Sequence, residues 1–488
     1  MTSARRSSPR AATVCLGALA AILLAGCSAP TLVVQPAAPK ALALVHTVPE
    51  TGVGPAGGAS AGGVLPVEEA WRDPATWPRR FGRGRGGTMG LVEEMEGPVV
   101  AMRQGDEQRR EIEREMLEDI AKLMTLRGRG WLRGAPLVTV KGEGAGAFVF
   151  TTDRNADPKR VKSPTSPAMY FKFTSGSRDD TGEVVRMQRT WFAYYDPFGY
   201  GPYDQVSTRP SPAGVVILIP GIFGTPVSQV NQVLHTLRSR GWAVLRMLSQ
   251  PSRFTENAAF VLAEGAGGQG GRGSAEVESF ARSIADTLGD RAAECAYAVE
   301  DTMSLLVQRR PMLAGAPRVA LGMSGGAMVM PTVVARNPNA YAAAVLIAGG
   351  VDFLSVALES NYSEWIDALR FRRPGGAPLT SAQRGQLVRA YRRAAPLDSL
   401  YTAASLRGKP VLMLHGTQDR AVPAHLGDEL WEVAGRPERW TFDAGHEFLF
   451  FWLPRHTSRL ADWVDQHAGP GREAGSTPAE SAAREPRE

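Results

Sequence analysis

One serine of this chain lies in a glycine-rich sequence that suits a nucleophile. Gly322-Met323-Ser324-Gly325-Gly326 fits the pattern G-x-S-x-G, in which a sharp turn between a strand and a helix exposes the serine hydroxyl. Glycines are needed there because neighbouring chain segments pass too close for a Cβ. Ser324 is therefore the candidate nucleophile.

The same five-residue pattern occurs once more in the chain, from Gly58 to Gly62 around Ser60. That copy lies in a low-complexity stretch, with neither a predicted strand before it nor a predicted helix after it. Before Ser324, residues 318–321 predict a short buried strand, and an apolar helix is predicted from Ala327. This context favours Ser324, since the turn requires a strand followed by a helix.

A serine hydroxyl is a poor nucleophile at neutral pH, so it needs a base and a third group that orients the base. Among seven histidines, His446 follows the last predicted strand and is the candidate base. Asp419, in the loop after a buried strand, is the candidate acid, because one helix and one strand separate it from His446. Asp352, after the preceding strand, is the alternative acid. We predict that His415 is a packing residue at a strand end.

Acyl chemistry also requires amide donors for the negative charge that develops on the attacked carbonyl oxygen. One donor is expected to be the backbone N–H of Gly325, directly after the nucleophile. The other is expected from the loop that follows the strand at 215–219, and the N–H of Ile222 is the best placed. The alternative for this loop is a simple turn from strand to helix.

The elements that must position these residues follow an alternating pattern after Ala213. Short apolar runs alternate with amphipathic segments, which is typical of a parallel sheet wrapped by helices. Period-two runs before Ala213 predict antiparallel strands that open a mixed sheet, and a helix is predicted over residues 106–126. The predicted strands are 137–140, 147–151, 168–174, 184–195, 215–219, 242–248, 318–321, 342–347, 411–414 and 439–442, and the later helices are 227–240, 276–309, 327–336 and 425–434.

Taken together, these motifs make residues 168–467 resemble the α/β-hydrolase superfamily, in its serine esterase and lipase-like branch. The resemblance implies an α/β-hydrolase fold: a mostly parallel sheet flanked by helices, with a helical lid insertion at 353–408 and an N-terminal extension. Some members place the acid one strand earlier, which is why Asp352 remains the rival. Many members have His-Gly where this chain has Pro220-Gly221. The first 167 residues resemble no family that we can name.

The resemblance implies that Ser324, His446 and Asp419 cleave a carboxylic ester, less readily an amide, through an acyl-enzyme. No metal or organic cofactor is required, and the substrate would be a small-molecule or lipid ester. Two alternatives remain open: an acyltransferase on the same fold, and an inactive lipoprotein that uses the fold for binding. Substrate identity and oligomeric state cannot be read from the sequence.

The first 27 residues predict export and a lipid anchor. Arg5, Arg6 and Arg10 precede an uncharged run, 11–26, which has the length of a signal-peptide core. The run leads into Leu24-Ala25-Gly26-Cys27, which resembles a bacterial lipobox whose cysteine is lipidated after cleavage. Cys27 would then hold the protein to a membrane of the bacterial cell envelope. The alternative is an ordinary signal peptide.

Composition and charge are those of a globular protein, with 43% apolar and 21% charged residues. Three units of the formal net charge of +6 come from the signal segment, which argues against a nucleic-acid partner. Outside the signal segment and anchor, Cys295 is the remaining cysteine, so no internal disulfide is expected. The predicted domains are a signal peptide (1–26), a flexible tether (27–105), an extension with a helix and strands (106–167), the catalytic domain (168–467) and a disordered tail (468–488).

Overall fold

A computed structural model describes the part of the chain that carries the motifs. The described residues are 32–37, 66–77, 89–95, 168–178, 184–197, 211–221, 227–248, 258–261, 271–362, 369–372 and 378–469. The predicted signal peptide with Cys27, the second G-x-S-x-G pattern around Ser60, the helix at 106–126, the strands at 137–140 and 147–151, and the tail beyond Gly469 lie outside the described residues.

A ten-stranded mixed sheet forms the centre of the molecule, in the order β1-β12-β11-β9-β8-β5-β6-β4-β3-β2. The strands from β12 to β6 in this order run parallel to one another, and antiparallel strands continue the sheet at both sides. The strands are β1 Leu32–Gln35, β2 Met89–Met95, β3 Met169–Arg178, β4 Val184–Tyr195, β5 Gly214–Ile219, β6 Trp242–Met247, β8 Arg318–Met323, β9 Ala343–Ile347, β11 Val411–Gly416 and β12 Glu438–Phe442.

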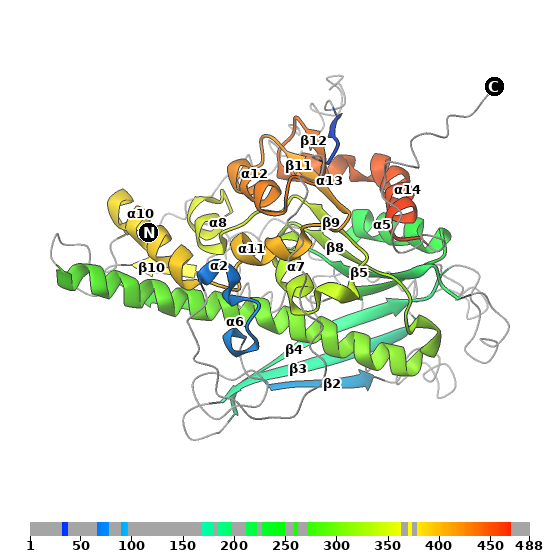
Figure 1. Cartoon of the computed structure of the whole chain (residues 1–488), viewed down its shortest axis with the longest axis horizontal. Coiled ribbons are helices and arrows are strands. Elements are labelled where there is room, and N and C mark those ends of the chain that lie inside the picture. The colour runs from blue at the N-terminus through cyan, green and yellow to red at the C-terminus, as the bar shows by residue number, and fades with distance from the viewer. Residues whose placement is uncertain are drawn as a thin grey trace, which may run out of the picture.

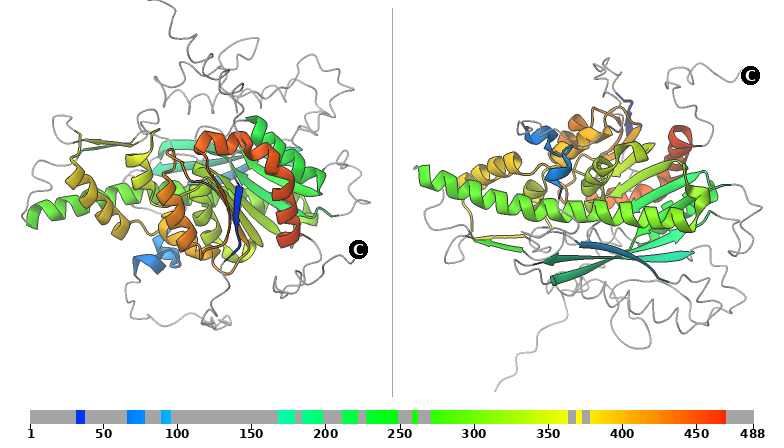
Figure 2. Two further views of the ribbon diagram at one scale, coloured as in Figure 1. Left: turned by 90° about the horizontal axis from the view of Figure 1, so that it is seen from above. Right: turned by 60° about the horizontal axis from the view of Figure 1, so that its bottom comes forward.

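The central strands are apolar throughout because both faces of the sheet are covered. Side chains of a strand alternate between the two faces, and on β5 Val215 and Ile217 enter one core while Val216 and Leu218 enter the other. Helices lie on both sides of the sheet in Figures 1 and 2. They are α5 Val227–Ser239, α6 Gly271–Arg309, α7 Gly325–Arg336, α12 Ala424–Val433, α13 His446–Trp452 and α14 Thr457–Ala468.

The predicted fold class is confirmed, and most predicted elements lie where the sequence pattern put them. The opening strands are antiparallel: β3 pairs with β4, and β4 with β6. From β5 onward strands and helices alternate as expected. The long predicted helix begins five residues earlier than expected, at Gly271 rather than at Glu276.

Part of the segment predicted as a flexible tether belongs instead to the folded domain. β1 pairs with β12 and β2 with β3, so both strands extend the central sheet. Between them, α2 (Val67–Ala70) precedes η1 (Pro74–Thr76). Trp71 and Trp77 next to these short helices are buried, and the Trp77 ring packs against Tyr297 at 6.2 Å. The two tryptophans bury apolar surface, which a composition rich in Ala, Pro and Gly obscured.

The segment predicted as a lid contains α8 Phe353–Glu359, β10 Leu369–Arg372, α10 Ser381–Ala394, α11 Ser399–Thr402 and η8 Ala403–Leu406. β10 pairs with β7 (Ala258–Val261) in a separate two-stranded sheet. In Figure 1, α10 lies along the part of α6 that reaches away from the central sheet. The end of the segment packs on α7 and buries Leu406. That end is therefore part of the core rather than of a cover.

Among the helices that the structure describes, none has both the length and the apolar character needed to cross a bilayer.

Candidate active site

Ser324 lies in the tight turn between β8 and α7, in a backbone conformation that residues other than glycine rarely adopt. Its φ is 53° and its ψ is −122°. The N–H of Ser324 donates to the carbonyl oxygen of Ile347, at the end of the neighbouring strand β9, over 2.7 Å. The turn is thereby held against the sheet, and the strain is of the kind found at functional sites.

The glycines around Ser324 are required by the packing of this turn. A Cβ on Gly326 would lie 2.1 Å from the carbonyl oxygen of Ile219 on β5, and a Cβ on Gly322 would lie 2.6 Å from the Cα of Ala327. Neither backbone contact could be relieved by moving a side chain. The close approach of chain segments expected from the sequence is therefore present.

The structure brings Ser324, His446 and Asp419 into a chain of hydrogen bonds. The Oγ of Ser324 is 2.9 Å from Nε2 of His446, and Nδ1 of His446 is 2.6 Å from Oδ2 of Asp419. His446 and Asp419 are both buried, and Ser324 is half-buried. In this arrangement the imidazole can take the hydroxyl proton while the carboxylate orients the ring.

The carboxylate of Asp419 is held by backbone amides as well as by the histidine. Its Oδ1 accepts hydrogen bonds from the N–H groups of Ala421 at 3.0 Å and Val422 at 2.8 Å. Its Oδ2 is then directed at His446. The two backbone amides fix the orientation of the carboxylate, and the carboxylate in turn fixes the orientation of the imidazole.

Of the two predicted amide donors, the structure describes Gly325 but not Ile222. Gly325 is the first residue of α7, so its N–H belongs to the amino end of a helix, where donors are available to a developing negative charge. Ile222 lies outside the described residues. Its neighbour Gly221 passes directly beside the nucleophile, since a Cβ on Gly221 would lie 2.9 Å from the Cβ of Ser324.

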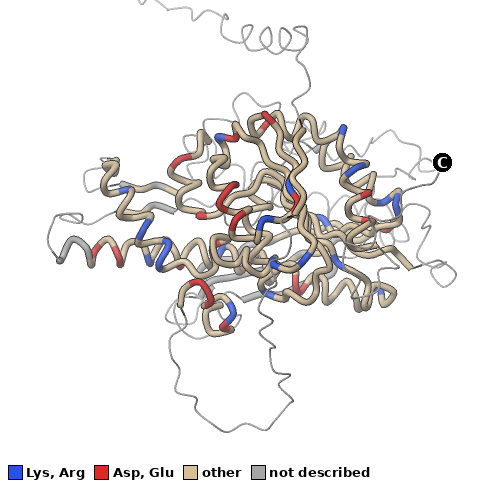
Figure 3. Tube along the Cα trace, turned by 45° about the horizontal axis from the view of Figure 1, so that its top comes forward, with Lys and Arg blue, Asp and Glu red and all other residues tan. Residues whose placement is uncertain are grey.

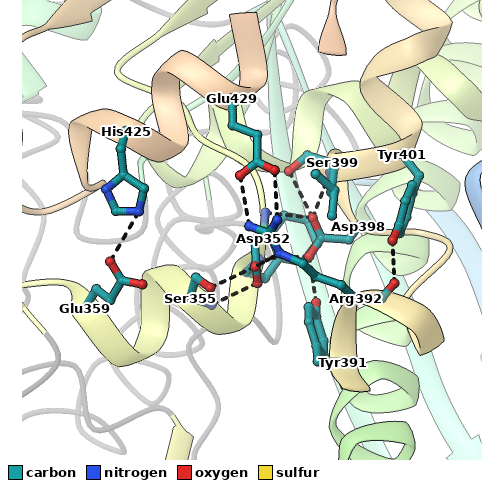
Figure 4. Close-up of polar contacts among 12 residues, drawn as sticks. Asp352, Ser355, Glu359, Tyr391, Arg392, Asp398, Ser399, Tyr401, His425 and Glu429 are labelled. Atoms are coloured by element: carbon teal, nitrogen blue, oxygen red, sulfur yellow. Dashed lines mark hydrogen bonds and ion pairs between the residues drawn. The ribbon is translucent and has the colours of Figure 1, made fainter. Parts of the chain in front are cut away.

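The rival acid Asp352 belongs to a second buried polar cluster rather than to His446. It begins α8, where Oδ1 accepts from the N–H of Ser355 and Oδ2 from its hydroxyl. The Nε of Arg392 donates to the same Oδ2 over 2.7 Å. Figure 4 shows this cluster between α8, α10, α11 and α12. The carboxylate of Asp352 is thus occupied by donors that have no part in proton transfer.

A second aspartate completes this cluster, which we call the Asp352–Asp398 cluster: Asp352, Ser355, Tyr391, Arg392, Asp398 and Glu429. Asp398 accepts from the N–H groups of Asp352 and Phe353 and from the hydroxyl of Tyr391. Arg392 also donates to both oxygens of Glu429, at 2.9 Å each. Burial and the nearby charge of Asp352 raise the pKa of Asp398 to about 6.

Tyr362 and Glu447 contact the site and were given no role from the sequence. The Tyr362 ring lies edge-on to the His446 ring at 6.1 Å, and its hydroxyl donates to Glu447. Burial and this bond raise the pKa of Tyr362 above its usual value. The N–H of Asn361 donates to the carbonyl oxygen of Arg420, next to the acid. The only sequence signal was that Glu447 adjoins His446.

Two other histidines that the structure describes, His415 and His425, pair with carboxylates outside the triad. His415, predicted to be a packing residue, is buried at the end of β11, and burial together with the charge of Arg439 lowers its pKa to about 4. His425 pairs with Glu359 at 3.3 Å on the surface. Within the described ranges, no three His, Cys, Asp or Glu side chains gather so as to hold a metal ion.

Comparison with known proteins gives a family match over part of the chain. Residues 254–433 match the prolyl oligopeptidase family. This stretch contains Ser324 and Asp419 and ends before His446. No curated protein sequence matches the chain.

Among solved structures, an acylaminoacyl peptidase of Pyrococcus horikoshii is similar at 13% identity and a TM-score of 0.37, over 61% of this chain and 42% of that one. The chain thus spans less than half the length of that peptidase. An esterase of Pyrococcus furiosus matches at 13% identity and a TM-score of 0.34, over 58% of this chain and 88% of that one. Est1E of Butyrivibrio proteoclasticus matches at 14% identity and a TM-score of 0.35, over 57% and 95%.

The mostly parallel sheet between helices carries a serine on a strained turn from strand to helix. Residues 254–433 of the same domain match a family of serine peptidases. The chain therefore has the fold of the α/β-hydrolase superfamily, and the domain that carries Ser324 is of the serine hydrolase kind.

Proposed function

We propose that the chain hydrolyses a carboxylic ester with Ser324 as nucleophile, His446 as general base and Asp419 as the acid that orients it. One observation carries this proposal: the unbroken series of hydrogen bonds from Ser324 through His446 to Asp419. Such a series supplies both needs of a serine nucleophile, a base within reach and a fixed orientation for that base.

In the first half-reaction, the Oγ of Ser324 attacks the ester carbonyl carbon as Nε2 of His446 takes the hydroxyl proton. Negative charge forms on the carbonyl oxygen, where the N–H of Gly325 and the N–H of Ile222 would donate. When the tetrahedral intermediate collapses, His446 returns its proton to the departing alkoxide. The alcohol leaves, and the acyl group stays bonded to Ser324.

In the second half-reaction, water replaces the alcohol. His446 takes a proton from the water, the hydroxide attacks the acyl carbon, and the new intermediate collapses to release the carboxylic acid. The proton returns from His446 to the Oγ of Ser324. Throughout the cycle Asp419 orients the imidazole and stabilises the imidazolium, since its second oxygen is held by two backbone amides.

An amide is the second candidate substrate, and the match of residues 254–433 to the prolyl oligopeptidase family favours it. The same three side chains would serve, with an amine as the leaving group that His446 protonates. The ratio of kcat/KM for a p-nitrophenyl ester to that for a matched peptidyl p-nitroanilide distinguishes the two. Because activated esters react faster than anilides even with serine peptidases, a ratio far above that of a serine peptidase assayed alongside supports the ester, and a ratio near or below it would show that amides are substrates.

Labelling with a fluorophosphonate probe tests the nucleophile directly. The wild-type chain should be labelled at Ser324, and Ser324→Ala should not be labelled. Ser355→Ala is the matched control, since this buried serine donates to Asp352 and has no imidazole partner. If Ser324→Ala is labelled as strongly as the wild type, or the wild type is not labelled, the proposed nucleophile is wrong.

A further inference from the structure

The chain enters the central sheet at the same edge that holds the triad. β1 runs antiparallel to β12, with Leu32 opposite Phe442 and Gln35 opposite Arg439. Phe442 is the last residue of β12, and His446 follows it after three residues. The amino end of β1 therefore lies at the carboxyl edge of the parallel strands, which is also the edge of Ser324. In Figure 1 β1 lies beside β12.

This position limits how far the predicted lipid anchor can be from the site. Cys27 is five residues before Leu32, and an extended chain advances at most about 3.6 Å per residue. The Cα of Cys27 is thus within roughly 18 Å of the Cα of Leu32. The chain that follows Cys27 therefore joins the sheet at the edge that holds the triad.

Two aromatic side chains are exposed on α13, the helix that begins with His446. Phe448 and Phe451 on α13 are 50% and 57% exposed, and their spacing puts them on one face of the helix. The opposite face buries His446, Leu449 and Phe450. The exposed pair costs free energy in water and does not support the core, so its position beside the site calls for a partner.

An arginine lies close to this aromatic pair through Trp452, whose ring centroid is 5.9 Å from that of Phe451. The guanidinium of Arg455 stacks on Trp452 at 3.6 Å, directly after α13. Across the elements in view in Figure 3, basic and acidic positions are interspersed. Aromatic side chains at this edge can insert into a membrane interface, and a basic side chain beside them can contact lipid headgroups.

We propose that this edge, formed by the amino end of β1, by α13 and by Arg455, is the face of the protein that meets a lipid bilayer. Phe448 and Phe451 enter the interface, Arg455 binds lipid phosphate, and acylated Cys27 anchors the chain at the same edge. The triad then faces the bilayer, so its substrates are esters of lipids held in that bilayer. This last step rests on the proposed function, whereas the contact with the bilayer does not.

Vesicle binding tests the surface without the anchor and without catalysis. The Cys27→Ser chain is mixed with phosphatidylglycerol and phosphatidylcholine vesicles, and the bound fraction is measured by sedimentation. Adding Phe448→Ser and Phe451→Ser should lower the partition coefficient by roughly tenfold or more. Val261→Ser is the matched control, because Val261 is 62% exposed but lies on β7 of the separate sheet, and it should bind as the parent does. Equal thermal unfolding of all three variants shows that they are folded.

Two results would overturn the bilayer surface: a parent chain that does not bind vesicles, or a loss of binding that is as large for Val261→Ser as for the phenylalanine pair. A second measurement concerns the substrate class. For the acylated chain, the ratio of the rates on a vesicle-borne long-chain ester and a soluble short-chain ester should fall at least fivefold in the phenylalanine variant. Binding without hydrolysis of either ester would contradict the proposed function and leave the surface standing, whereas an unchanged ratio would overturn the lipid substrate alone.

Discussion

Two buried aspartates follow neighbouring strands of the sheet and do different work. Asp352 comes after β9 and Asp419 after β11, and these two strands are paired. Both side chains are almost inaccessible to water. Asp419 receives two backbone amides and one imidazole, whereas Asp352 receives an amide, a hydroxyl and the guanidinium of Arg392.

Under the proposed function, the partner and not the position in the fold decides what each buried carboxylate does. A guanidinium stays protonated under all ordinary conditions, so its pairing with Asp352 can only stabilise the structure. An imidazole exchanges its proton near neutral pH, so its pairing with Asp419 can support catalysis. Changes at the two sites should therefore separate activity from stability.

The largest expected effect is on activity, at Asp419. Asp419→Asn should lower kcat for ester hydrolysis by about 10⁴-fold, because the amide would favour the wrong tautomer of His446. Thermal unfolding should change far less than activity does. Steady-state kinetics and a melting curve on the same preparation test this, and a loss of less than tenfold would argue that another group orients His446.

The reverse effect is expected at Asp352. Asp352→Asn removes the charge that pairs with Arg392, and the free energy of unfolding should fall by about 2 kcal/mol. The kcat of the remaining folded protein should stay within roughly threefold of the wild type. Urea unfolding measures the change in the free energy of unfolding. Active-site titration gives the concentration of folded enzyme from which kcat is calculated.

A surface carboxylate provides the control for Asp352. Glu359→Gln removes an exposed ion pair with His425, and it should change stability by less than about 0.5 kcal/mol. If Asp352→Asn abolishes turnover while the fold remains stable, the two aspartates share the catalytic role and the comparison above does not hold.

A smaller effect on activity is expected from the contacts beside His446. Tyr362→Phe removes the hydrogen bond to Glu447 but keeps the ring against the imidazole. Loss of one such bond should lower kcat by about three- to tenfold and leave KM nearly unchanged. Tyr401→Phe is the control, since its hydroxyl donates to the Arg392 carbonyl oxygen in the other cluster. Equal effects of the two changes on kcat would show a general loss of stability rather than positioning.

A last pair of effects, which oppose each other, concerns the dependence of stability on pH. The pKa of Asp398 is raised from 3.8 to about 6, so the native state binds the proton more tightly, and the stability that this contributes is lost as pH rises from about 4 through 6. The pKa of His415 is lowered from 6.5 to about 4, so its contribution is present above pH 6.5 and lost as pH falls towards 4. The two contributions have opposite slopes.

Unfolding free energies measured between pH 4 and pH 7 test both groups. Asp398→Asn should make stability rise more steeply with pH in this window, and His415→Gln should make it rise less steeply. A variant whose curve runs parallel to that of the wild type would show that the substituted group does not titrate there.

The sequence was most informative where local pattern and tertiary requirement agree. The run around Val215 and the alternating helices were predicted because strands buried on both faces are apolar without interruption. Gly322 and Gly326 could be interpreted for a similar reason, since the turn leaves no room for a Cβ. The strands β1 and β2 were missed because short edge strands in a stretch rich in Gly and Pro carry little periodicity.

By itself, the sequence determined the fold class, the strand-to-helix turn around Ser324 and the order of the three candidate residues, because these depend on patterns within a few neighbouring positions. Only the tertiary structure decided that His446 lies beside Asp419 and that Asp352 lies beside Arg392. It also decided that Tyr362 contacts the imidazole and that β1 enters at the edge of the site. Such contacts join residues far apart in the chain, and no local sequence pattern predicts the order of strands that brings them together.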